Sequence, residues 1–111
     1  MTSQPPDVPR LLPWPGPEGK PCYLIGDGNG YVTRVADNVE SVQLAMASEL
    51  LDHAADMLDD RQVTSAQLRY VVARMSEALR DVQRIAESRG ARLHAERRPA
   101  SADGRGVGPL P

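Results

Sequence analysis

The stretch that decides the fold is DNVESVQLAMASELLDHAADMLDD (residues 37–60), followed after a short link by TSAQLRYVVARMSEALRDVQRIAESRG (residues 64–90). In both stretches apolar residues recur at steps of three and four, which is the period of an amphipathic helix. The link is too short for anything but a reversal of direction. We therefore expect a mainly α fold built on an antiparallel two-helix hairpin.

Both stretches carry signals for helix ends. Asp37 with Glu40, and Thr64 with Gln67, have the spacing of a capping box, in which each residue satisfies a backbone N–H of the first helical turn. Gly90 stands where a left-handed residue commonly ends a helix. These signals predict helices over residues 37–60 and 64–90.

The first predicted helix has more apolar surface than one partner helix can cover. One stripe contains Val39, Val42, Met46, Leu50, Ala54 and Met57, and a second stripe, displaced round the helix, contains Leu44, Ala47, Leu51, Ala55 and Leu58. Together they span roughly half of the circumference, against the ~100° that a helix facing one core needs. We expect the second stripe to be an interaction surface, and the helices to form a coiled-coil-like dimer of hairpins.

The two predicted helices differ in charge. Residues 37–60 include seven acidic residues and neither Lys nor Arg, whereas residues 61–90 include six arginines. Opposite charges on neighbouring helices favour their pairing, although exposed ion pairs set register more than stability.

The region before the helices has a β pattern. Residues 22–25 (CYLI) and 31–35 (YVTRV) flank the turn sequence DGNG at residues 27–30. Glycine and asparagine tolerate the positive φ of tight turns, so we expect a short β-hairpin with one face against the helices. The run PCYLIGDG (residues 21–28), with the helical hairpin after it, resembles small uncharacterised proteins of actinomycetes. That resemblance implies no activity.

Composition sets the expected limits of the domain. The chain has 111 residues; residues 1–19 are rich in proline and residues 91–111 in proline and glycine. Such segments bury too little surface to offset the entropy of ordering, so we expect disordered tails on both sides of a domain at residues 20–90. A core of about 70 residues is marginal, and a single Cys22 excludes an internal disulfide. Self-association is the remaining ordinary source of stability.

Three candidate sites have simpler structural explanations. The glycines from Gly26 to Gly30 lack the third glycine of a dinucleotide loop, because Tyr31 takes its place. Cys22 is better interpreted as a small buried hydrophobe than as a reactive thiol. Acidic residues and one histidine lie on one side of the first helix, and a solvated acidic face explains them better than a metal or acid–base site; these are Glu49, His53, Asp56 and Asp60. We expect no cofactor, no metal and no catalytic residue.

The resulting hypothesis is a small non-enzymatic protein–protein interaction or regulatory protein, acting as a helical homodimer or with another protein. One alternative is a DNA-associated accessory regulator that uses the arginine-rich end, namely Arg80, Arg84, Arg89, Arg92, Arg97 and Arg98. Favourable charge at a helix C-terminus also explains these arginines, and the net charge of −2 gives no general attraction to nucleic acid. A second alternative is a metal- or nucleotide-binding enzyme.

The expected location follows from what the sequence lacks. No apolar run reaches the ~20 residues that cross a bilayer, and the N-terminus has no pattern of a secretory signal. Twelve arginines against one lysine suggest a GC-rich genome. We expect a cytoplasmic bacterial protein without membrane contact.

Overall fold

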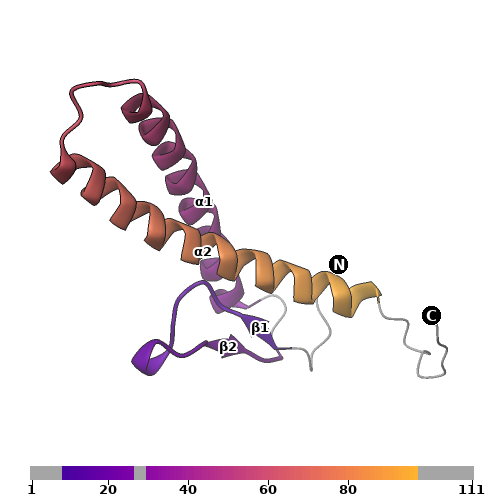
Figure 1. The fold of residues 1–111 in the computed structure, drawn as a ribbon. Coiled ribbons are helices and arrows are strands. Elements are labelled where there is room, and N and C mark those ends of the chain that lie inside the picture. The colour runs from indigo at the N-terminus through magenta and orange to yellow at the C-terminus, as the bar shows by residue number, and fades with distance from the viewer. Residues whose placement is uncertain (1–8, 27–29, 98–111) are drawn as a thin grey trace, which may run out of the picture.

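A computed structural model describes residues 9–26 and 30–97. The elements in chain order are β1 (Arg10–Leu11), the 3₁₀ turn η1 (Pro17–Gly19), β2 (Tyr23–Leu24), α1 (Tyr31–Leu58) and α2 (Ser65–Arg97). The expected class is confirmed: a two-stranded antiparallel hairpin precedes an antiparallel pair of helices. Figure 1 shows that α1 and α2 diverge toward their connecting turn, while the two strands lie at the opposite end of the helix pair.

One strand of the hairpin, β2, lies within the predicted strand at residues 22–25, but its partner is not the predicted one. β2 pairs with β1, with Arg10 opposite Leu24 and Leu11 opposite Tyr23. Beside the pair, the Leu12 N–H donates to the carbonyl oxygen of Cys22 at 2.8 Å. The prediction of a strand at residues 31–35 is wrong, because these residues form the first turns of α1.

The helical period explains why α1 begins early. Val32, Val35, Ala36 and Val39 continue the stripe backward at steps of three and four, and Ala36 is completely buried. β-branched residues prefer strands only weakly, so burial of one helical face decides the outcome. The N-cap is Gly30, in an extended conformation and without a side-chain bond. The prediction of a cap at Asp37 is therefore wrong.

One predicted helix end in α2 is confirmed and the other is wrong. The Thr64 N–H donates to Gln67 Oε1 at 2.9 Å, and the Gln67 N–H donates to Thr64 Oγ at 3.1 Å, which is the reciprocal capping box. Gly90 does not end the helix, which continues to Arg97. A glycine inside a helix costs about 1 kcal/mol relative to alanine, too little to stop a helix whose later residues make contacts.

The predicted boundary of the N-terminal tail, at residue 19, is also wrong. Residues 10–19 contain β1 and η1, and Leu12 and Pro13 are among the buried residues. The C-terminal boundary moves from residue 90 to the end of α2. Residues 1–8 and 98–111 lie outside the described residues. Within the described ranges, no helix is long and apolar enough to cross a membrane.

Candidate interaction surface

A buried cluster of charges joins the first strand to both helices. The Arg10 guanidinium, on β1, contacts Asp37 at 2.7 Å and Glu40 at 3.3 Å, both on α1. Glu40 also accepts from Arg89 of α2 at 3.2 Å. The Glu40 side chain is 1% exposed and that of Arg10 is 5% exposed. We call this region, with its neighbouring backbone contacts, the ribbon junction.

Side chains of both helices bind backbone carbonyls next to β1. The Ser88 hydroxyl donates to the carbonyl oxygen of Leu11 at 2.8 Å. Gln43 of α1 and Arg84 of α2 both donate to the carbonyl oxygen of Pro13, at 3.1 and 3.2 Å. The segment from Arg10 to Pro13 is thus held from two sides and fixes the helices relative to each other at this end.

Burial and a neighbouring like charge both act on Arg92, beside the ribbon junction. Burial, followed by the nearby guanidinium of Arg10, lowers the pKa of Arg92, and Glu40 and Asp37 oppose this shift. Arg92 donates to the Ser88 hydroxyl at 2.6 Å. Arginine loses its proton only far above neutral pH, so the group stays charged. The contacts of the cluster join β1 to both helices.

The arginine-rich end predicted as an alternative DNA contact is partly used inside the molecule. Arg84 contacts Asp81 at 3.3 Å besides Pro13, Arg89 contacts Glu40, and Arg92 contacts Ser88. The Arg84, Arg89 and Arg92 guanidinium groups thus bind a backbone carbonyl, carboxylates and a hydroxyl of the same chain. Arg98 lies outside the described residues, and the DNA-binding alternative stays a prediction.

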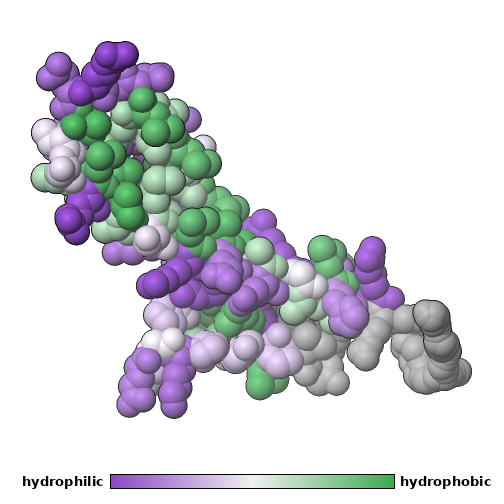
Figure 2. Space-filling model, viewed as in Figure 1, coloured by the Kyte–Doolittle hydropathy of each residue, from purple (hydrophilic) through white to green (hydrophobic). Residues whose placement is uncertain are grey.

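The predicted interaction residues lie on the part of the helices away from the ribbon junction, which we call the helical arm (residues 44–82). Leu51 and Leu58 are 62% and 86% exposed, and Ala55 is also exposed. Leu44 and Ala47 are half-buried. Figure 2 shows hydrophobic residues gathered over the helical arm and hydrophilic residues over the end that carries the strands.

An apolar groove runs along the helical arm between the helices. Its volume is about 260 Å³, and the residues that line it come from both helices: Ala47, Leu50 and Leu51 from α1, and Met75, Ala78, Leu79 and Val82 from α2. None of these side chains is charged. The groove therefore places Ala47 and Leu51 of the predicted stripe beside α2, and its surface suits an apolar occupant.

The α2 side of this surface was missed by sequence reasoning. Leu68, Val72 and Leu79 are large apolar residues that are exposed on α2, Leu79 to 66%. The sequence signal was that α2 also has a wide apolar stripe, which includes the adjacent residues Val71 and Val72. Two adjacent residues on a helix cannot both face the same neighbour. One of them, Val71, is buried against α1 and the other faces outward. The apolar face is thus shared by two helices.

The residues considered for metal binding lie on a different side of the helical arm. His53, Asp56 and Asp60 line a polar-rimmed pocket of about 450 Å³, shared with Tyr70. Glu49 lies at a neighbouring hollow with His53 and Arg74. In the part of the chain that the structure describes, no three His, Cys, Asp or Glu residues gather as metal ligands would.

Two other candidates remain as single residues. Cys22 is a half-buried free thiol directly before the first residue of β2. The centre of the glycine-rich turn, residues 27–29, lies outside the described residues.

The chain was compared with protein-family models, with curated proteins and with solved structures, and none of them matched it.

Proposed function

We propose that this chain is a non-enzymatic protein–protein interaction or regulatory protein that acts as a helical dimer through the apolar face of the helical arm. The observation that carries this proposal is the exposure of large apolar side chains on both helices, including Leu51, Leu58 and Leu79. Apolar area contributes roughly 25 cal/mol per Å² when it leaves water, so a contiguous face of this kind favours association.

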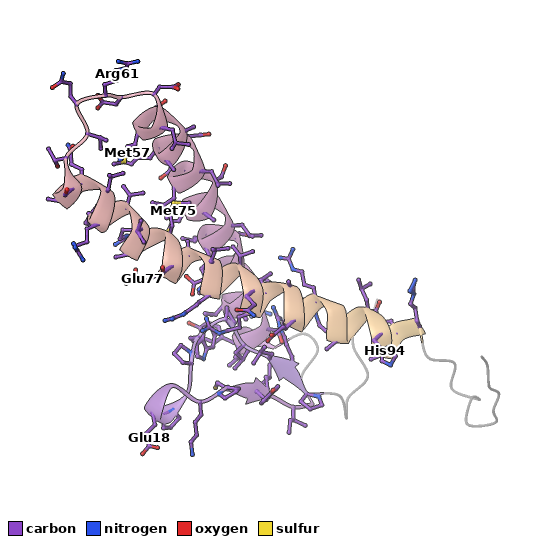
Figure 3. All side chains as sticks on the ribbon, in the orientation of Figure 1. Glu18, Met57, Arg61, Met75, Glu77 and His94 are labelled. Carbon is purple, nitrogen blue, oxygen red and sulfur yellow. The ribbon has the colours of Figure 1, made fainter. Side chains whose placement is uncertain are left out.

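The small core of the protomer supports the same proposal. Among the described residues the buried hydrophobic ones are Leu12, Ala36, Val71 and Ile85. Only Val71 lies within the helical arm, although Met57 and Met75 lie in the space between α1 and α2 (Figure 3). Helices depend on packing of an apolar face more than on propensity. An apolar surface from another chain, packed on the helical arm, would therefore complete its core.

The ribbon junction supports a scaffolding role. Contacts from β1 hold α1 and α2 together at one end, whereas the helical arm at the other end offers an open groove. The contacts at the ribbon junction hold α1 and α2 in place, so the apolar face of the helical arm does not have to be covered within the protomer. Pre-ordering of a binding face reduces the entropy lost on association.

Light scattering with size-exclusion chromatography tests the proposal. The wild-type chain at micromolar concentration should elute as a dimer, and Leu51→Glu should raise the dimer dissociation constant by about a hundredfold or more, because each interface would bury a carboxylate. Val42→Glu is the matched control. Val42 is 56% exposed, a fraction close to that of Leu51. It lies nine residues before Leu51 on α1 and is therefore on the opposite side of the helix.

Circular dichroism of both variants should show the helical content of the wild type. A compact wild-type monomer at these concentrations would contradict the proposal. Equal loss of association in Leu51→Glu and Val42→Glu would also contradict it, because the effect would then not belong to one face.

A further inference from the structure

Exposed charges follow the apolar residues of the helical arm in a regular way. On α1, Asp52 and Asp59 come directly after Leu51 and Leu58; on α2, Arg69 and Arg80 come directly after Leu68 and Leu79. One residue is a rotation of about 100° round a helix, so each charge lies beside the apolar face rather than on it. The apolar face therefore has an acidic edge along α1 and a basic edge along α2.

These edge charges have no partner within the protomer. All four side chains are exposed, and none forms an ion pair within residues 9–26 and 30–97. α1 and α2 lie between the two edges, so the acidic and basic residues point away from each other at opposite sides of the apolar face. Within the protomer water solvates these charges, which leaves them available to pair with a second chain.

The edge charges also follow the same order along the helical arm. Because α1 and α2 are antiparallel and joined by a short turn, Asp59 and Arg69 lie nearer that turn than Asp52 and Arg80. Met57 shares a pocket with Ala66 and Gln67 close to the turn, whereas Leu51 and Leu79 line the groove farther from it. A partner that presents the same face at the same level would bring opposite charges together.

We propose that the occupant of the groove is a second copy of this chain, placed so that α1 of each copy packs on α2 of the other. This proposal rests on the proposed function and specifies its geometry. A twofold axis along the helical arm puts the acidic edge of one copy, with Asp52 and Asp59, along the basic edge of the other, with Arg69 and Arg80. An axis across the helices would put α1 on α1 and oppose like charges. Edge charges of this kind set orientation in helical dimers.

Charge exchange between the edges tests the orientation. Asp52→Arg with Asp59→Arg makes both edges basic, and Arg69→Glu with Arg80→Glu makes both acidic. Each double variant should raise the dimer dissociation constant about tenfold or more at low salt, with the difference shrinking as salt screens it. The variant with all four changes should return to within about threefold of the wild type. The two double variants, mixed, should form a one-to-one dimer.

The possible results separate the two proposals. Double variants that dimerise as tightly as the wild type would overturn the orientation while leaving the proposed function standing, because an α1-on-α1 dimer opposes like charges before and after the exchange. A wild-type monomer that Leu51→Glu leaves unchanged would instead overturn the proposed function. If a double variant loses helical content, its dissociation constant does not report the orientation, and cysteine pairing is used to measure it.

Cysteine pairing measures the orientation without altering several charges. In a Cys22→Ser background, one copy carrying Asp59→Cys and another carrying Arg69→Cys should form a disulfide with each other on mild oxidation. A copy carrying His53→Cys is the control and should pair poorly with Arg69→Cys, because His53 lies six residues before Asp59, about 120° round α1, and lines the pocket on another side of the helix. Equal pairing of both would overturn the proposed orientation.

Discussion

A single buried carboxylate, Glu40, links the three parts of the fold. Glu40 lies on α1 and accepts hydrogen bonds from Arg10 on β1 and from Arg89 on α2. Burying a charge is unfavourable unless it is paired, and replacing an ion pair with apolar residues can even stabilise a protein. We infer that this cluster contributes specificity: it selects the strand that packs at this end of the helix pair.

Removing Glu40 should destabilise the fold because it leaves a buried guanidinium with less compensation. Glu40→Ala is expected to lower the free energy of unfolding by about 2–3 kcal/mol, less than for a fully isolated pair because Asp37 still contacts Arg10. Urea denaturation followed by circular dichroism measures this. Glu49→Ala, at an exposed position of the same helix, is the control and should change stability by less than about 0.5 kcal/mol.

Sequence reasoning at the residue level found local signals and missed distant ones. The capping box of Thr64 and Gln67 depends on residues three apart, and the structure confirms it. The Arg10–Glu40 pair joins residues 30 positions apart, and no local pattern announces it. In the proline-rich segment, the apolar pair Leu11 and Leu12 was the available hint that this stretch packs against a core.

At the scale of elements, type was predicted better than boundaries. Two helices were expected and found, but α1 begins six residues before the predicted Asp37, at Tyr31. The sequence YVTRV has the composition of a strand and the spacing of a helix, and tertiary burial of Ala36 favours the helix. The strand that pairs with β2 came from the segment expected to be a tail, because strand pairing is not local.

The continuation of α2 past Gly90 predicts a stabilising substitution. Gly90 lies within a helix, and a Cβ built on it meets no atom within 4 Å. Gly90→Ala should therefore raise the free energy of unfolding by about 0.5–1 kcal/mol, through reduced entropy of the unfolded chain. Urea denaturation at constant protein concentration measures the change.

A matched glycine gives the opposite expectation. Gly19 has φ +78° and equally open surroundings, so Gly19→Ala should lower stability by about 1 kcal/mol through backbone strain alone. Destabilisation by Gly90→Ala of similar size would show that Gly90 is left-handed and that α2 ends there, as the sequence first indicated.

At the scale of the whole molecule, half of the apolar face was predicted. The stripe on α1 could be identified because its width exceeds what one neighbour covers. The α2 half could not, because which of two adjacent apolar residues faces inward depends on how the helices cross. Val71 is buried and Val72 is exposed for this reason. The groove exists only through the relative placement of the helices, which periodicity does not specify.

The unfilled core of the helical arm predicts that the proposed dimer stabilises the fold, so that stability would depend on protein concentration. If dimerisation and folding are linked, mass action raises the melting temperature by about 3–5 °C for each tenfold increase in protein concentration. Calorimetry or circular dichroism over two decades of concentration measures this. Leu51→Glu should melt at a lower temperature that does not change with concentration, whereas Val42→Glu should follow the wild type. A wild-type melting temperature independent of concentration would mean that the protomer is stable alone, and that its exposed leucines contribute nothing to folding.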